Sequence, residues 1–338
     1  MRNIKSIDYI SKIFETITPS MRYDGKEDFS DWQKRAYDKL WDLLSLDKMV
    51  KCDDDDFLIE SKEHPDGYEK IRFSFQTEPG LYTPCYALIP DNTEIKGVVI
   101  CIQGHSKGMH ISIGEPRYEG EEEYIASRDS DFARRAIKEG YVAIAMEQRY
   151  MGESGCDQDG SPACLRVGRA QPTLLLGRCA IGERVWDVMR LIDVIEKYFP
   201  EYSGKKLICL GNSGGGTTTF YSTCIDKRID CGVPSCAVCT YKDSIVDLKH
   251  CPCNYIPGIG NYFDMGDIAG LAAPRKLVIV NGKIDSIFPD AGVQKTFAIA
   301  KDLFKAAGCE DNCRLVTGPE GHRFYADPAW EVINELMD

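Results

Sequence analysis

A serine flanked by small residues stands in the segment Gly211-Asn212-Ser213-Gly214-Gly215. An apolar run that can form a strand precedes this segment, and residues that can begin a helix follow it. A Gly-x-Ser-x-Gly turn between a strand and a helix is typical of a nucleophile elbow, where the strained backbone of the serine leaves room only for small neighbours. A phosphate-binding turn is disfavoured, because the segment has neither Gly-Lys-Ser/Thr nor Gly-x-Gly-x-x-Gly. The pattern therefore predicts Ser213 as a nucleophile.

A serine hydroxyl needs a base, and the base needs an acid that orients it. In chains with this kind of elbow the order is serine, then acid, then histidine. Only His250 and His322 follow Ser213, and His322 stands in a glycine-rich loop after a β-type run. We therefore predict His322 as the base and expect His250, in the sequence HCPC, to be structural.

The acid should follow the next-to-last strand of the sheet. Asp285 stands a few residues beyond the apolar run KLVIV, in a turn that Pro289 closes. Asp290 follows closely, and Asp264 and Asp267 lie upstream. These three carboxylates fit loop-capping or surface positions better, so Asp285 is the predicted acid.

An oxyanion formed on a substrate needs two backbone N–H donors. One usually comes from the residue after the nucleophile, which is Gly214, and the other from the loop after the third strand. The apolar run GVVICI ends in Gln103-Gly104-His105, so the second predicted donor is the backbone N–H of His105. No role is predicted for the side chain of His105.

Short apolar runs that alternate with helical stretches must position these residues. Strands that are apolar on both faces are typical of a parallel sheet covered by helices on both sides. We expect strands at Gly97–Ile102, Tyr141–Met146, Lys206–Leu210, Gly232–Val238 and Lys276–Val280, and helices at Ser130–Glu139, Gly182–Tyr198 and Phe297–Ala307.

The N-terminal part of the chain differs from the rest in the spacing of its apolar residues. Apolar residues recur at helical spacing from Phe29 to Leu44, and a β-type pattern begins at Glu69, with a hairpin around a Pro-Gly turn. We therefore expect residues 1–68 to form a helical extension packed on a catalytic domain of residues 69–338. Residues 106–130 and 150–175 lack strong periodicity, and we expect loops or lid elements there.

The chain is acidic, with a formal net charge of −12. That balance argues against a nucleic-acid partner and against docking on an anionic membrane. The N-terminal residues have no uninterrupted apolar stretch, which predicts neither a signal peptide nor a membrane anchor. The 15 cysteines are an odd number in a chain without an export signal, so we expect reduced cysteines and a cytoplasmic location.

A serine nucleophile with a base, an acid and oxyanion donors predicts acyl transfer, and we expect hydrolysis of carboxylic esters. Two other functions compete with it. A peptidase or amidase would share the same three residues, and comparing ester with amide substrates would separate the two. A zinc protein is the second alternative, because Cys236-x-x-Cys239 and His250-Cys251-Pro-Cys253 superficially suit thiolate ligation. Cys236 and Cys239 lie in or just after an apolar β-type run that would point neighbouring side chains apart. We therefore predict no metal and no other cofactor.

Four motifs together resemble a known family. GVVICIQGH, GNSGGG, VNGKIDSIFP and GPEGHRF are similar to the dienelactone-hydrolase-like branch of the α/β hydrolases, and more closely to its bacterial acetyl xylan esterase-like group. The resemblance runs from about residue 69 to 325. It implies a mixed, mainly parallel eight-stranded sheet and cofactor-free hydrolysis of carboxylic esters. It also implies Ser213, Asp285 and His322 as the triad.

The chain departs from that family at two places. Dienelactone hydrolases carry a cysteine where this chain has Ser213, which puts lactone specificity in doubt. The Arg-Gly-Gln motif common among acetyl xylan esterases is replaced after the fourth strand by Gln148-Arg149-Tyr150. Acetylated sugar is therefore no more than one candidate among small esters.

Overall fold

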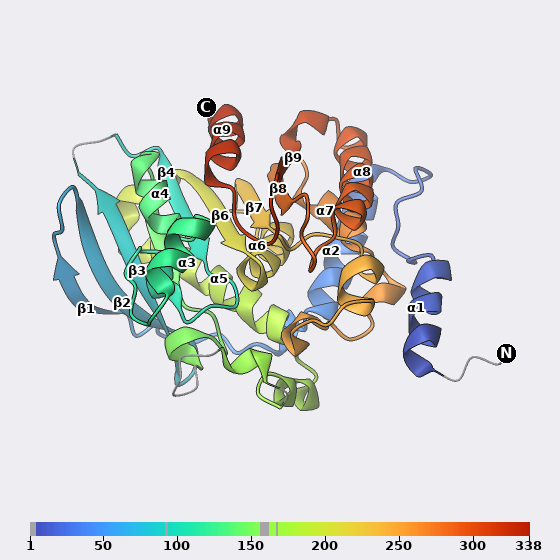
Figure 1. The fold of residues 1–338 in the computed structure, drawn as a ribbon, viewed down its shortest axis with the longest axis horizontal. Helices are drawn as coiled ribbons and strands as arrows, with labels where there is room; N and C mark the ends of the chain where they lie inside the picture. Colours follow the sequence, from blue (N-terminus) through green and yellow to red (C-terminus); the bar gives the residue numbers. More distant parts are fainter. Residues whose placement is uncertain (1–4, 92–93, 156–161, 167) are drawn as a thin grey trace.

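A nine-stranded sheet organises the described part of the chain. The computed structural model describes residues 5–91, 94–155, 162–166 and 168–338. The strand order is β1-β2-β3-β5-β4-β6-β7-β8-β9 (Figure 1). The strands are β1 Leu58–Glu63, β2 Tyr68–Glu78, β3 Leu81–Pro90, β4 Gly97–Ile102, β5 Val142–Met146, β6 Lys206–Asn212, β7 Cys231–Ser235, β8 Lys276–Gly282 and β9 Cys313–Gly318.

The sheet is antiparallel at one side and parallel across the rest. The pairs β1–β2, β2–β3 and β3–β5 are antiparallel, and every pair from β5 to β9 is parallel. The predicted mainly parallel sheet and the hairpin around the Pro-Gly turn are confirmed. The expected number of eight strands is wrong, because β1 adds a ninth.

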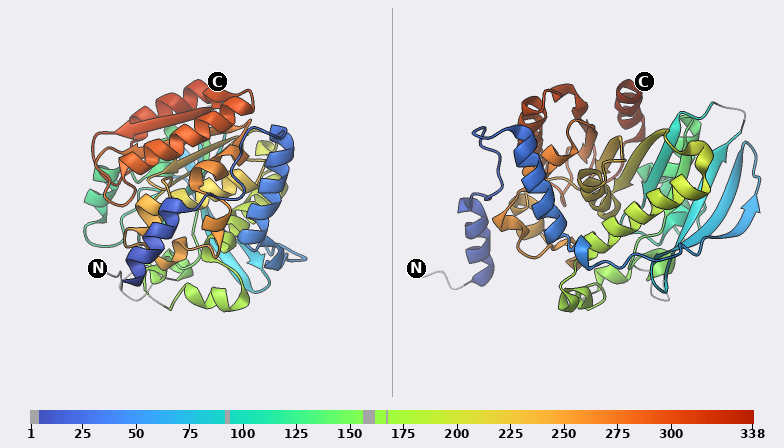
Figure 2. Two further views of the ribbon diagram at one scale, coloured as in Figure 1. Left: turned by 90° about the vertical axis from the view of Figure 1, so that its right-hand side faces the viewer. Right: turned by 180° about the vertical axis from the view of Figure 1, so that it is seen from behind.

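Helices cover both faces of the sheet, as the apolar strands require. On one face α4 packs against β3, β4 and β5 and α9 packs against β8 and β9, while α5 packs on the opposite face (Figures 1 and 2). A further core joins α2, α6, α7 and α8. The helices are α1 Ser6–Thr16, α2 Phe29–Leu43, α3 Glu121–Arg128, α4 Phe132–Lys138, α5 Ala180–Tyr198, α6 Gly214–Ile225, α7 Met265–Ala269, α8 Asp290–Ala306 and α9 Ala326–Met337.

The predicted boundary at residue 69 falls inside the sheet. Strand β1 pairs with β2 over five residue pairs, so residues 58–63 belong to the sheet and the expectation of a wholly helical extension is wrong. Strand β1 was not predicted, because it is an edge strand whose residues are mostly exposed and its sequence therefore has no apolar run. Helix α2 is part of the main core: Trp32 and Leu40 are fully buried, and the Trp32 indole donates to the Met21 carbonyl at 2.7 Å.

The parallel strands bring their carboxyl ends to one edge of the sheet. Strands β4, β6, β8 and β9 each lead there into a loop or a helix that carries one of the predicted site residues. Residues 106–130, expected as loops or lid elements, contain a short 3-10 turn and helix α3. Residues 150–175 contain short 3-10 turns, although residues 156–161 and 167 lie outside the described residues. None of the described helices combines the length and apolarity needed to cross a bilayer.

Candidate active site

Ser213 occupies a strained turn between β6 and α6. Its φ is 56° and its ψ is −122°, a backbone conformation that residues with a side chain rarely adopt. A Cβ at Gly215 would lie 2.1 Å from the Ile102 carbonyl oxygen, and one at Gly211 would lie 2.6 Å from the backbone of Gly215. Only glycine allows β4, β6 and the start of α6 to approach this closely, so the turn has the geometry expected of a nucleophile elbow.

Asp285 and His322 form a hydrogen-bonded pair. The Nδ1 atom of His322 lies 2.8 Å from Asp285 Oδ2. The other carboxylate oxygen, Oδ1, accepts hydrogen bonds from the backbone N–H groups of Ile287, at 2.7 Å, and Phe288, at 3.1 Å. When Nδ1 donates to Asp285, Nε2 of His322 carries a lone pair and can accept a proton.

The pKa of Asp285 is held below its ordinary value. Burial alone would raise it, since the carboxyl is only 4% exposed. The hydrogen bond and charge of His322, with the N–H groups of Ile287 and Phe288, outweigh that effect and lower the pKa. Asp285 is therefore a carboxylate at neutral pH.

Ser213 and His322 face the same cavity of about 310 Å³. Within the described residues, the Ser213 hydroxyl makes no hydrogen bond, so the two side chains share a cavity without a direct bond. His322 also stacks on Phe288, with 6.1 Å between ring centres. The cavity is lined by Gly104, His105, Tyr124, Arg128, Leu165, Asn212, Ser213, Gly214, Thr217, Lys249, His250, Cys251, Asn254, Ile287, Phe288 and His322.

The loop after β4 lies directly against the elbow. A Cβ at Gly104 would meet the Asn212 carbonyl oxygen at 2.7 Å and the Cβ of Ser213 at 3.1 Å. The imidazole of His105 covers Gly214, where a Cβ would lie 2.7 Å from its Cε1. Neither Gly214 nor His105 gives its backbone N–H to another described residue, so both N–H groups remain available beside Ser213.

A buried glutamine holds this loop in place. The side-chain amide of Gln148 donates to the Gln103 carbonyl oxygen, and its own oxygen accepts from Thr218 Oγ1 at 2.6 Å. Gln148 thus links the loop after β4 to helix α6, one turn beyond the elbow. In the sequence, Gln148 is notable only as part of the segment that stands in place of the Arg-Gly-Gln motif of the resembled family.

Helix α3 forms one wall of the cavity through Tyr124 and Arg128. Arg128 also donates from Nη1 to the backbone carbonyl of His322, at 3.1 Å. A second contact joins the end of α3 to the same loop, where Asp129 accepts from Arg323 at 2.8 Å. The two segments without periodicity, 106–130 and 150–175, therefore both reach the cavity, the latter through Leu165.

His250 lies at the cavity although the sequence predicted a structural role. Its Nε2 lies 2.9 Å from Ser244 Oγ, and its ring packs edge-on against Phe288 at 5.2 Å. Burial lowers the pKa of His250. These contacts fix the ring at the side of the cavity, and its lowered pKa favours the neutral form. The packing agrees with the prediction that His250 is structural, but its position beside the cavity was not predicted.

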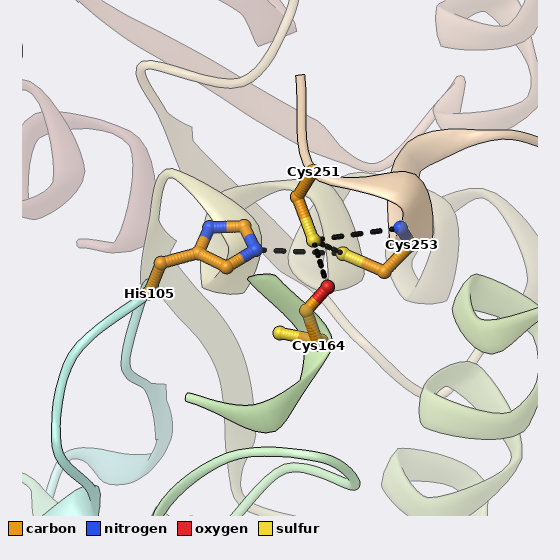
Figure 3. Close-up of side chains that lie close together, drawn as sticks. All are labelled: His105, Cys164, Cys251 and Cys253. Carbon is orange, nitrogen blue, oxygen red and sulfur yellow. Dashed lines mark hydrogen bonds between the residues drawn. The ribbon is translucent and has the colours of Figure 1, made fainter. Parts of the chain in front are cut away.

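The cysteines considered as a zinc set separate in space. Cys236 lies beside Asp285 and His322, and Cys239 lies against the Pro289 carbonyl, 3.8 Å away. Cys251 and Cys253 instead meet His105 and Cys164 (Figure 3). Sequence reasoning missed this second group because Cys164 and His105 are distant along the chain and stand in no shared motif.

Comparison with known proteins agrees with the fold. The family described as "Abhydrolase family" matches residues 1–168, just under half of the chain. "Putative hydrolase YtaP" of Bacillus subtilis is 23% identical over 248 residues, which are 71% of this chain and 77% of that protein.

Solved structures with the same architecture cover nearly the whole chain. The structure described as a "putative acetyl xylan esterase (BF1801)" from Bacteroides fragilis has a TM-score of 0.74 and 18% identity, covering 97% of this chain and 84% of its own. A glucuronoyl esterase from Solibacter usitatus has a TM-score of 0.71 and 13% identity, with coverages of 95% and 97%. The sheet, the strained serine turn and these relatives agree: the chain has the α/β-hydrolase fold.

Proposed function

We propose that the chain is a serine carboxylesterase that hydrolyses small carboxylic esters through an acyl-enzyme. The observation that carries the proposal is the 2.8 Å contact between His322 and Asp285, in a cavity that also holds the strained Ser213. In this arrangement Ser213 is the nucleophile, His322 the general base and Asp285 the orienting acid. The names of several structural relatives, which are esterases, support the same reaction.

The reaction has two halves. Ser213 Oγ attacks the ester carbonyl while Nε2 of His322 takes its proton, and the imidazolium then protonates the departing alcohol. Water, activated by the same nitrogen, attacks the acyl-enzyme and releases the acid. Asp285 stays ionised throughout and stabilises the imidazolium, in keeping with its lowered pKa.

The oxyanion of each tetrahedral intermediate would lie on the backbone N–H groups of Gly214 and His105. Both groups stand beside Ser213, and neither is used by another described residue. Such preorganised donors stabilise charge that develops only in the transition state.

The size of the cavity limits the substrate. About 310 Å³ lies at the lower end of the range for ligand pockets, roughly 300–1,000 Å³, and it has to hold both the acyl group and part of the alcohol. We therefore propose short acyl groups, with acetate as the first to test. A chain-length series of p-nitrophenyl esters should show kcat/KM falling beyond the shortest acyl chains.

The Ser213→Ala variant tests the nucleophile. We expect p-nitrophenyl acetate turnover to fall by about 10⁴-fold or more, the scale seen when a triad member is removed. Ser222→Ala is a matched control, because Ser222 lies on α6, is buried, and its hydroxyl has no hydrogen-bond partner among the residues that the structure describes. Retention of most activity in Ser213→Ala would overturn the assignment. Aminoacyl amides cleaved faster than esters would favour the amidase alternative.

A further inference from the structure

Three sulfur atoms and one imidazole nitrogen converge next to the candidate active site. Nε2 of His105 and the Sγ atoms of Cys164, Cys251 and Cys253 all lie within 4.8 Å of one another (Figure 3). Cys253 Sγ lies 2.9 Å from Cys251 Sγ and 3.4 Å from His105 Nε2. The three cysteines of this cluster are free, and Cys164 and Cys253 are fully or almost fully buried.

The donor set and its geometry suit one kind of ion. Zn²⁺ binds thiolate at about 2.3 Å and imidazole at about 2.0 Å in a tetrahedron, which places the ligand atoms roughly 3.5–3.8 Å apart. The observed separations run from 2.9 Å, between the Sγ atoms of Cys251 and Cys253, to at most 4.8 Å. Side-chain movements that lengthen the first and shorten the longest would reach the tetrahedral geometry. Three sulfurs and one nitrogen select zinc over magnesium or calcium, which prefer oxygen ligands.

A buried arginine supplies an independent observation. Arg184 is 1% exposed, and its Nη1 donates to Cys253 Sγ at 3.4 Å. Its other hydrogen bonds go to the neutral Arg149 carbonyl, at 3.0 and 3.2 Å. Within the described residues no carboxylate pairs with Arg184. A buried guanidinium requires a compensating negative charge, and among the residues that the structure describes the candidates in contact with it are these sulfurs.

The net charge of the zinc-bound cluster would match the charge of the buried Arg184. Three thiolates and one neutral imidazole around Zn²⁺ carry a net charge of −1, which the guanidinium of Arg184 neutralises. Binding replaces the thiol protons, so up to three protons leave for solvent and no electrons are transferred. Three thiolates without a cation would repel one another in a buried site, and three neutral thiols would leave Arg184 unpaired. A single thiolate at Cys253, which contacts Arg184, is the metal-free alternative, and metal analysis separates it from the zinc site.

We propose that His105, Cys164, Cys251 and Cys253 bind one structural Zn²⁺ ion, with Arg184 as its charge partner. Four protein ligands leave no open position for water or substrate, so the ion takes no part in the chemical step. Instead, the ion would hold three segments of the chain together. The ligands come from the loop after β4, from the turn Ala163–Leu165, and from the segment that begins the turn Pro252–Asn254.

Through His105 the ion would also act on the candidate active site. The imidazole lies between the sulfur cluster and Gly214, so a bond to zinc fixes the residue whose backbone N–H is the proposed second oxyanion donor. This consequence rests on the proposed esterase function, whereas the metal site itself does not.

Metal analysis of the untagged, full-length chain, purified under reducing conditions, tests the site. We expect about one zinc per chain. Cobalt(II), added to zinc-free protein, should give the thiolate-to-cobalt charge-transfer band and the intense visible bands of a tetrahedral site. Cys164→Ser, Cys251→Ser and Cys253→Ser should each weaken zinc binding by more than about 100-fold, beyond the roughly 10–100-fold loss seen for partners outside the ligand shell.

Two controls separate this proposal from the esterase proposal. Cys309→Ser changes a free, partly exposed cysteine outside the cluster and should retain one zinc. Ser213→Ala should lose esterase activity and also retain one zinc. An inactive wild-type protein with stoichiometric zinc would overturn the esterase and leave the metal site standing.

Three results would overturn the metal site. The first is wild-type protein that neither contains zinc nor takes up zinc or cobalt. The second is a Cys251–Cys253 disulfide in protein kept under reducing conditions. The third is unchanged zinc binding in all three cysteine variants. If a cysteine variant fails to fold, the cobalt spectrum of the wild type still decides between thiolate and other ligands.

Discussion

The buried carboxyl group of Glu147, near the candidate active site, should make the free energy of unfolding depend on pH. This residue follows β5 and is 2% exposed. Its Oε2 accepts hydrogen bonds from the backbone N–H groups of Met109 and Glu153, both at 3.2 Å. The carboxyl group also occupies the space beside Gly152, where a Cβ would lie 1.9 Å from Oε2. Glu147 therefore joins two loops that surround the cavity.

Burial raises the pKa of Glu147 to about 7, against an ordinary value of 4.5, although the backbone N–H groups oppose the shift. At about 1.4 kcal/mol per unit, a shift of that size corresponds to about 3 kcal/mol. The folded state holds the proton more tightly than the unfolded state does. The stability that this group contributes therefore falls as pH rises from about 4.5 to 7, and it stays low above pH 7.

Glu147→Gln removes the titration and keeps one oxygen that can accept both N–H groups. We expect the free energy of unfolding of the variant, relative to the wild type, to rise by about 3 kcal/mol between pH 4.5 and pH 8. Urea unfolding followed by circular dichroism at pH 4.5, 6 and 8 measures this difference, and contributions from other titrating groups cancel in it.

Glu153→Gln is the matched control. The pKa of Glu153 is lowered, first by its hydrogen bond to Arg72, so its removal should cost more stability at neutral pH than in acid. The relative stability of this variant should therefore not rise with pH. A Glu147→Gln difference that is constant from pH 4.5 to pH 8 would refute the reasoning, because it would mean that Glu147 has the same pKa in both states.

The acid and the N-terminal core each give a further expected outcome. Asp285→Asn should lower kcat for p-nitrophenyl acetate by about 10⁴-fold with little change in KM, because the amide favours the wrong tautomer of His322; a loss in KM alone would contradict this role. Trp32→Ala should lower the free energy of unfolding by about 3–5 kcal/mol, measured in urea, since Trp32 is fully buried. A loss below about 1 kcal/mol would place α2 outside the main core.

The sequence predicts what depends on local pattern. The apolar runs that became β4 to β8 are buried on both faces, and the elbow has a distinctive arrangement of glycines around Ser213. Chain order, together with the positions of Asp285 and His322 just after predicted strands, selected them as partners, and the structure brings those two into contact. Their catalytic roles remain a proposal.

Features that depend on distant contacts were not predictable in this way. Strand β1 is an exposed edge strand that the pairing with β2 defines, so its sequence carries no apolar signal. The sulfur cluster joins residues from three segments. Spacing in the sequence grouped Cys251 and Cys253 with Cys236 and Cys239, which lie elsewhere, and gave no sign of Cys164 or His105. The side chain of His105 had no predicted role, because nothing near it in the sequence indicates its sulfur neighbours.

The contact of Arg128 with the backbone of His322 has a consequence for how substrates are selected. Helix α3 is a wall of the cavity and is also bonded to the loop that carries the proposed base. A bulky ester that pushed this wall outward would pull His322 away from Ser213. We therefore expect oversized substrates to bind and still react slowly, so that discrimination by size appears in kcat and such esters act as competitive inhibitors of smaller ones.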